Sequence, residues 1–109
     1  MPPSKPLKFS RAQKKALRPL FEERVSRSRG CWTWVGALNT NGYGKLSWKP
    51  LGLWQVSAHR IAFALLRKPI PKNLGVLHTC DNPPCVNPKH LFLGTTLMNA
   101  LDAKAKGRL

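Results

Sequence analysis

The fold of this 109-residue chain is decided by one short stretch, His78-Thr-Cys-Asp-Asn-Pro-Pro-Cys-Val-Asn-Pro-Lys-His90. The stretch contains two of the three cysteines and two of the three histidines of the whole sequence. It also contains three prolines, which supply no backbone N–H for regular structure. A loop of this composition is expected to hold one shape only when something ties it together, as metals often do in small domains.

Three residues of the stretch have the spacing of a metal clip. Cys80, Cys85 and His90 place two thiols and an imidazole on one loop, five residues apart each time. Zinc prefers such ligands in a tetrahedral arrangement, and a structural zinc site is closed by a fourth ligand. The remaining cysteine, Cys31, would complete the set; the alternative is that it is a buried free thiol. The sequence predicts a structural zinc held by all four residues.

Two other residues of the stretch do not belong to this spacing. His78 ends a predicted strand, and its imidazole can accept a proton near neutral pH, which suits a general base. The alternative is a strand-end histidine with a hydrogen-bonding role only. Asn87 carries an amide that can bind the loop backbone and hold the region of His78 in place.

The charge of the chain points to a polyanionic partner. Lysine and arginine number 19 against four acidic residues, which gives a formal net charge of +15. Such a balance favours nucleic acid, although a basic protein that is merely soluble is the alternative. No amphipathic or transmembrane pattern competes with that interpretation, so we expect no membrane partner.

The first residues, Met-Pro-Pro-Ser-Lys-Pro, lack the apolar segment of a signal peptide. We therefore expect the chain to stay in a reducing cytoplasm, where clustered thiols bind metal rather than form disulfides. Residues 1–9 are predicted to be a disordered basic arm, and residues 10–109 a single domain without internal repeats. The basic segment that follows the arm either tracks phosphates or is a solvated helix face.

The apolar pattern and the turn residues predict alternating short helices and strands. Ser10 is expected to cap the first helix, Pro19 to separate the first two, and Ser57 to cap the third. Residues 31–35 and 43–48 are expected to pair around a turn at 39–42. The expected elements are helices over 11–17 and 20–25, strands over 31–35, 43–48 and 53–56, a helix over 58–66, strands over 76–78 and 91–93, and a last helix from 95 or 96 to about 106.

This order of strand, histidine, loop, strand and helix resembles the ββα-metal (His-Me finger) nucleases. Within them the chain resembles HNH endonucleases of phage and homing type, and especially the His-Cys box homing endonucleases. The resemblance covers about residues 20–108. Its specific part is residues 76–91, supported by Gly30-Cys-Trp-Thr-Trp34, Asn41-Gly-Tyr-Gly44 and Ala58-His-Arg60.

The resemblance implies an α+β fold, in which a zinc-stapled ββα-metal motif follows a small antiparallel sheet and helices. It implies a DNA endonuclease that hydrolyses phosphodiester bonds to a 5′-phosphate and a 3′-hydroxyl, in bacterial or phage-infected cytoplasm. His78 would be the base that activates water, and Asn87 the loop-ordering asparagine. Asn99 would be the protein ligand of one Mg²⁺ or Mn²⁺; the alternative is a solvated amide on the helix surface.

The resemblance also implies a basic residue that steadies the scissile phosphate, for which Arg60 is the first candidate and Lys45 the second. One position departs from many HNH nucleases: Leu77 stands where they carry Asp or His as a second metal ligand. His59, next to Arg60, is expected to pack or to contact phosphate rather than to act as a base.

The segment from Thr33 to Gln55 suits a ribbon that enters the major groove of double-stranded DNA, bound by a monomer or a homodimer. The alternative is that its tryptophans are mostly core. The candidate DNA-binding residues are Lys45, Trp48, Lys49, Gln55 and Arg60.

Two other functions remain open on the sequence. One is a catalytically silent, zinc-stabilised DNA-binding protein, and the other is a small basic zinc protein associated with RNA or ribosomes. Both need the charge and the metal clip, but neither needs His78 or Asn99.

Overall fold

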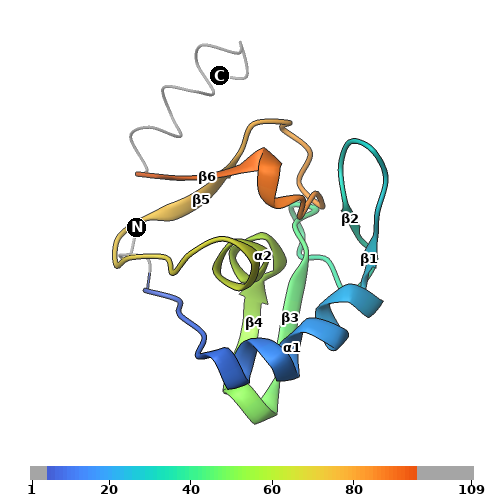
Figure 1. Ribbon diagram of the computed structural model, residues 1–109. Coiled ribbons are helices and arrows are strands. Elements are labelled where there is room, and N and C mark those ends of the chain that lie inside the picture. Colours follow the sequence, from blue (N-terminus) through green and yellow to red (C-terminus); the bar gives the residue numbers. More distant parts are fainter. Residues whose placement is uncertain (1–4, 96–109) are drawn as a thin grey trace.

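The structure, a computed structural model, describes residues 5–95. Within that range the fold consists of two helices and three two-stranded antiparallel sheets, which pack together around one core (Figure 1). The elements in chain order are α1 (Arg11–Glu23), β1 (Val25–Ser26), β2 (Thr33–Trp34), β3 (Lys45–Trp48), the 3-10 turn Lys49–Leu51, β4 (Leu53–Ser57), α2 (Ala58–Leu66), β5 (Gly75–His78), the 3-10 turn Pro88–His90 and β6 (Leu91–Gly94). The small α+β architecture is as expected, but the helix that would complete a ββα-metal motif lies outside the described residues.

Helix α2 is the centre of the core. Its nine residues include six buried ones, and the most deeply buried large side chains are Ile61 and Phe63. A helix that is apolar nearly all round is stable only when other elements cover it. Figure 1 shows α1 on one side of α2 and the β5–β6 hairpin on the other, and both contact it. The helix predicted over 58–66 is confirmed, although the Ser57 side chain makes no capping bond.

Helix α1 is one continuous helix, so the predicted separation at Pro19 is wrong. Ser10 caps it as expected: its hydroxyl accepts from Gln13 N at 3.1 Å, and Gln13 Oε1 accepts from Ser10 N at 2.8 Å. Leu17 and Phe21, on either side of the proline, are fully buried. Burying each contributes about 1.5–3 kcal/mol, which together offsets the roughly 3 kcal/mol cost of an interior proline.

The predicted disordered arm of residues 1–9 is corrected for its second half. Leu7 and Ile70 exchange two backbone hydrogen bonds of 3.0 and 2.8 Å, and Phe9 is 6% exposed in the core. Prolines and lysines dominate the composition of this segment, so its two apolar residues Leu7 and Phe9 gave no clear signal of burial. Their burial outweighs the entropy of ordering the segment, and it fixes residues 5–9 against the loop that precedes β5.

The predicted pairing of residues 31–35 with residues 43–48 is also wrong. Strand β3 pairs instead with β4, with Leu46 opposite Val56, and the short connection through Gly52 keeps the loop-closure cost low. Strand β2 pairs with β1, which no pattern had predicted, with Trp34 opposite Val25. The strand predicted over 53–56 is confirmed as part of β4.

Trp34 explains why the chain turns away after β2. Its ring is 2% exposed and its indole N–H donates to Ala37 O at 3.0 Å. The ring crosses the backbone at Gly44, where an added Cβ would lie 2.6 Å from ring atoms. Only glycine permits this approach, so Trp34 is a core residue rather than a base-reading one.

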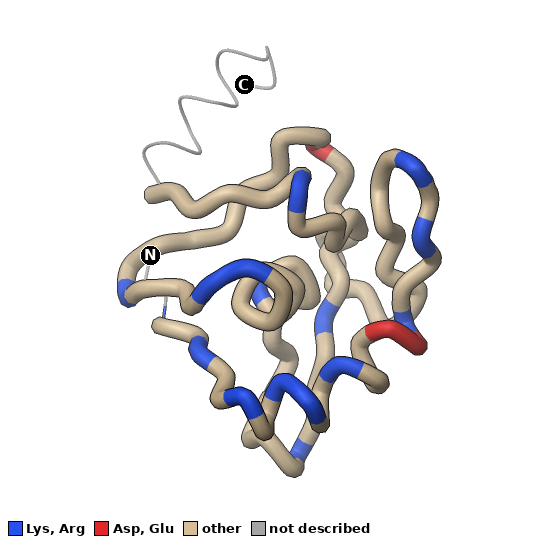
Figure 2. The backbone as a smooth tube through the Cα atoms, viewed as in Figure 1, with Lys and Arg blue, Asp and Glu red and all other residues tan. Residues whose placement is uncertain are grey.

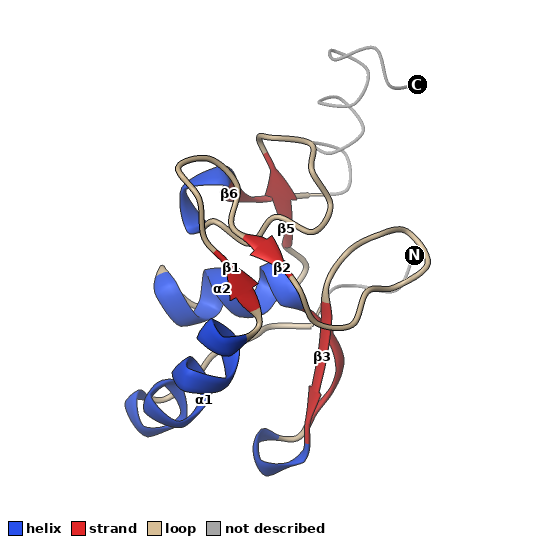
Figure 3. Ribbon diagram, turned by 90° about the vertical axis from the view of Figure 1, so that its right-hand side faces the viewer, coloured by secondary structure: helices blue, strands red, loops and turns tan. Residues whose placement is uncertain are grey.

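The β5–β6 hairpin forms as predicted and frames the stretch 78–90. His78 pairs with Leu91 at the end of the ladder, and Thr79 N donates to His90 O at 2.8 Å. The long loop between the two strands therefore leaves and returns at one point. Figure 3 shows this loop beside the β1–β2 hairpin, and the backbone bridge between Thr33 and Cys85 confirms that the two touch.

Candidate active site and metal centre

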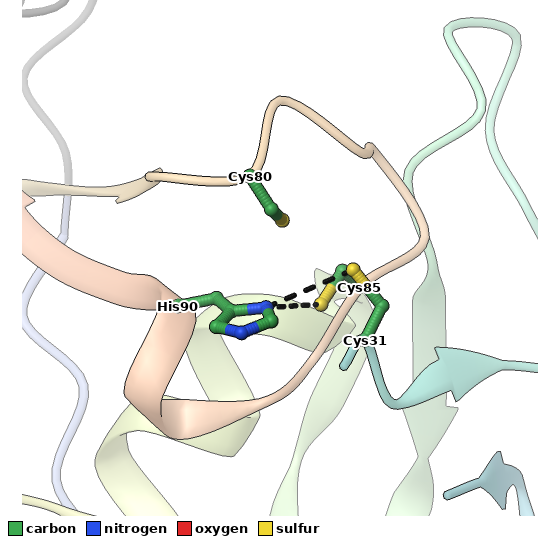
Figure 4. Close-up of side chains that lie close together, drawn as sticks. All are labelled: Cys31, Cys80, Cys85 and His90. Atoms are coloured by element: carbon green, nitrogen blue, oxygen red, sulfur yellow. Dashed lines mark hydrogen bonds between the residues drawn. The ribbon is translucent and has the colours of Figure 1, made fainter. Parts of the chain in front are cut away.

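The structure brings together all four predicted zinc ligands. The ligand atoms of Cys31, Cys80, Cys85 and His90 lie within 4.8 Å of one another (Figure 4). His90 Nδ1 is 3.7 Å from the Cys31 sulfur and 3.5 Å from the Cys85 sulfur. Tetrahedral zinc with ordinary bond lengths separates a sulfur from a nitrogen ligand by about 3.5 Å, so this donor set fits zinc closely.

Backbone hydrogen bonds, and not only a metal ion, place Cys31 beside the other three candidate zinc ligands. Trp34 N donates to Pro84 O at 2.8 Å, and Val86 N donates to Trp32 O at 2.7 Å. These two bonds align the segment around Cys31 with the cysteine-containing loop. A β-type contact between segments far apart in the sequence thus brings together the metal group, that is, the four candidate zinc ligands.

The thiols of the group polarise one another. Burial raises the pKa of the Cys31 thiol, but hydrogen bonds, from Asn82 first and then from Cys85 and His90, outweigh it and lower the pKa to about 7. Burial raises the pKa of Cys85 to about 12, and its bond to Cys31 adds to that. The lowered pKa favours the thiolate form of Cys31, which is the form of a cysteine that binds a metal ion.

Asn87 connects both sides of the metal group. Its side-chain carbonyl accepts from Lys89 N at 3.0 Å and caps the turn that presents His90. Its amide donates to Gly30 O at 2.7 Å, beside Cys31 in the sequence. The side chain is buried and does not line the pocket that contains His78, so the loop-ordering role stays a prediction that these two bonds support.

Replacing Asn87 with Ala is expected to lower the free energy of unfolding by about 2 kcal/mol, because a cap is lost and the Gly30 carbonyl is left without its donor. Denaturant unfolding of the zinc-loaded protein measures this. Asn41→Ala, at an exposed turn position, is the matched control and should change stability little. Equal midpoints for the two variants would contradict the role assigned to Asn87.

His78 is held in one orientation by the same loop. It is buried at the end of β5, and its Nε2 lies 2.8 Å from Cys85 O. Because a carbonyl only accepts, Nε2 carries the hydrogen and Nδ1 keeps the lone pair. Burial lowers the pKa of His78, and the Cys85 carbonyl and the charge of Asp81 partly oppose this. His78 is therefore a neutral imidazole with a basic nitrogen of fixed identity.

His78 opens into a pocket of about 250 Å³. The pocket lies between the turn before β3, the start of α2 and the end of β5, and it is also lined by Asn39, Tyr43, Ser57, His59 and Asp81. Three rings form one wall: His59 and His78 have centroids 4.9 Å apart, and Tyr43 lies 5.5 Å from the first and 5.7 Å from the second.

His59 is the site residue whose placement the sequence did not reveal. It lies on the first turn of α2 with its ring against that of His78, and its Nδ1 is buried. Burial lowers its pKa to about 3, and the charge of Arg60, with that of His78 when His78 is protonated, adds to this. One sequence signal could have placed His59 in the site. It lies at the start of a buried helix that directly follows a strand, and such a junction directs the first helical side chains back toward the sheet.

Arg60 lies away from the pocket of His78. One guanidinium nitrogen donates to Leu74 O at 3.1 Å and another to Lys5 O at 2.6 Å. These bonds fasten the N-terminal segment and the loop before β5 to helix α2. The structure thus places Arg60 in a bracing position and does not bring it together with His78.

The candidate DNA-binding residues of the β3–β4 hairpin differ in exposure. Lys49 and Gln55 are exposed, Lys45 is half-buried, and Trp48 packs against the core. Gln55 has a φ of 47°, and its backbone N–H donates to Ser47 Oγ at 2.8 Å. Trp54, 77% exposed, is the largest free aromatic surface on the described residues. Asn99, the candidate ligand of the catalytic ion, lies outside those residues.

Comparison with known proteins relates the chain to phage proteins. Residues 56–101 match the family model of HNH endonucleases. The chain is 43% identical over 93 residues to protein 2.8 of Escherichia phage T7, covering 84% of this chain and 63% of that protein. It is 42% identical over 78 residues to protein 7.7 of the same phage, covering 72% and 58%. The chain thus spans about three fifths of the length of these relatives. No solved structure gives a significant match.

Proposed function

We propose, starting from the match of residues 56–101 to the HNH endonuclease family, that this chain is a metal-dependent DNA endonuclease. The observation that carries the proposal is the bond from His78 Nε2 to the Cys85 carbonyl, 2.8 Å long. It leaves a neutral Nδ1 as a proton acceptor at the edge of a pocket large enough for water and a phosphate group.

The hydrolysis follows from that acceptor. A water oxygen attacks the phosphorus in line, while His78 Nδ1 takes one of its protons. The bond between phosphorus and the 3′ oxygen breaks, and the 3′ oxygen gains a proton from solvent. The phosphate stays on the 5′ side, so the products are a 5′-phosphate and a 3′-hydroxyl.

A divalent ion, Mg²⁺ or Mn²⁺, when bound, would neutralise charge that develops on the departing oxygen. Asn99 is the residue proposed to hold it, on the resemblance to ββα-metal nucleases. Leu77 offers no ligand atom, so the remaining positions around the ion would be filled by water and phosphate oxygens.

The proposed zinc acts on the reaction through the loop. Cys85 offers its sulfur to the metal group and its carbonyl to His78. Zinc bound by the four ligands would therefore fix the position of that carbonyl and, with it, the direction of His78 Nδ1. In this way Cys85 would couple the structural zinc site to the proposed catalytic histidine, His78.

Double-stranded DNA is the proposed substrate. The net charge of +15 favours a polyanion, and Figure 2 shows lysine and arginine spread along α1 and at other places on the fold, with few acidic positions. Lys49 and Gln55, exposed on the β3–β4 hairpin, are proposed to contact the duplex, as is Lys45, which pairs with Ser57 of the pocket lining. We place the activity in the cytoplasm of a phage-infected bacterium. None of the described helices has the length and apolar character needed to cross a membrane.

Incubation of supercoiled plasmid with the zinc-loaded chain tests the function. Nicked or linear products are expected when Mg²⁺ or Mn²⁺ is added, and uncut plasmid when zinc-loaded protein receives no further ion. Omitting the ion is preferable to a chelator, because a chelator would also remove zinc. Tight DNA binding without cutting under every divalent ion would favour the catalytically silent DNA-binding protein instead.

A further inference from the structure

His59 Nδ1 is the one buried side-chain nitrogen or oxygen without a hydrogen-bond partner in the part of the chain that the structure describes. Leaving such a group unpaired costs about 1–3 kcal/mol, and buried polar atoms in proteins are nearly always paired. His59 is also one of the residues that line the pocket of His78. This combination points to a partner that enters the pocket.

The partner has to be a hydrogen-bond donor. The backbone of Val76 hydrogen-bonds the His59 ring in the sense that raises its pKa, which means that the carbonyl accepts from a ring N–H. Since Nδ1 has no partner, that N–H belongs to Nε2. Nδ1 therefore carries a lone pair, and a phosphate oxygen, which also only accepts, cannot satisfy it.

The surroundings keep the His59 ring uncharged. It packs against the tilted rings of His78 and Tyr43, and Arg60 adds a positive charge nearby. Its pKa of about 3 means that the ring remains an acceptor in neutral solution and does not take up the proton itself. His59 is thus suited to receive a hydrogen bond and unsuited to be the base.

Two imidazoles with the same orientation pattern face one pocket. His78 donates from Nε2 to the Cys85 carbonyl, and assigning the Val76 bond of His59 to its Nε2 gives the same pattern, with the lone pair of each ring on Nδ1. Their centroids are 4.9 Å apart and both residues line the same pocket, which brings the two rings within reach of one water molecule. A water has two hydrogens to donate, one for each ring.

We infer that His59 is a positioning residue, whose Nδ1 accepts one hydrogen of the attacking water while His78 Nδ1 accepts the other. The inference rests on the proposed function. With both hydrogens held, the remaining lone pair of the water oxygen points away from the two rings and toward the phosphate. His78 takes its proton as the oxygen–phosphorus bond forms, and the second hydrogen stays on the oxygen.

Three variants of His59 separate the hydrogen bond from the packing. His59→Asn keeps an acceptor near the position of Nδ1, His59→Gln keeps the donor toward Val76 but removes that acceptor, and His59→Phe keeps only the ring. Losing the water's orientation is expected to lower kcat about 10- to 100-fold in the Gln and Phe variants, with KM and zinc content unchanged. The Asn variant should recover part of the lost rate.

Each result decides the inference. Wild-type kcat in the Gln or Phe variant, or an Asn variant no faster than Phe, would overturn it, and a change in KM alone would make His59 a DNA contact. If the wild type itself does not cut DNA, the proposed function fails; if the wild type cuts and His59→Gln cuts equally well, only the inference fails.

Nitrogen NMR of the zinc-loaded wild type gives a readout independent of activity. Both His59 and His78 are expected to show a protonated Nε2 and an unprotonated Nδ1 at neutral pH. A hydrogen on His59 Nδ1 would rule out its role as the acceptor for water.

Discussion

His78→Gln is expected to lower kcat for DNA cleavage by about 10²- to 10⁴-fold, the usual contribution of a general base. The glutamine amide can still donate to the Cys85 carbonyl from the position of Nε2, but it offers no acceptor where Nδ1 was. Zinc content, melting temperature and DNA affinity should therefore stay close to those of the wild type. Single-turnover cleavage of a labelled duplex, with Mg²⁺ added, measures the loss.

The comparison with His78→Ala makes this experiment specific. Alanine removes the donor to Cys85 as well as the base, so it should cost both activity and stability, whereas glutamine should cost activity alone. Lys68→Ala, at an exposed position, controls for purification and handling. A glutamine variant as fast as the wild type would exclude His78 as the base, whatever the alanine variant does.

The second large effect is expected from loss of the metal. A structural zinc site contributes an apparent 10–16 kcal/mol, whereas the net stability of a small domain is only about 5–15 kcal/mol. Cys85→Ala, which removes a buried ligand, is therefore expected to unfold the loop of residues 79–90 and with it much of the domain. A chelator should do the same to the wild type, and excess zinc should reverse it.

Circular dichroism melting and the zinc content per chain, determined by mass spectrometry, check this prediction. Lys89→Ala is the matched control, because Lys89 is exposed in the same loop, next to His90, and offers no ligand to the group. It should keep one zinc and the wild-type melting temperature. One zinc per chain with unchanged melting in Cys85→Ala would show that Cys85 does not hold the metal.

Elements with a strong local pattern could be predicted from the sequence. Helix α2 and strands β5 and β6 contain short apolar runs next to turn residues, and they form as expected, as does strand β4. Elements whose partner is distant could not. The pairing of β1 with β2 involves two residues on each side, too few for a periodic signal, and the continuity of α1 through Pro19 depends on the core beneath it.

The candidate site divides in the same way. Spacing alone placed Cys80, Cys85 and His90 on one loop with His78 before it, and the count of cysteines pointed to Cys31 as the fourth ligand. No spacing pointed to the placement of Arg60 among backbone carbonyls, because that depends on where residues 5–9 fold back.

The sequence by itself determined which residue types are available to bind zinc and to accept a proton, because those properties belong to the side chains and their order along one loop. The tertiary structure alone decided which nitrogen of His78 is basic and that His59 shares its pocket. The first depends on the direction of the Cys85 carbonyl, and the second on α2 packing its first turn against the end of β5. Hydrogen-bond direction and ring contact are properties of the folded backbone, and no local pattern encodes them.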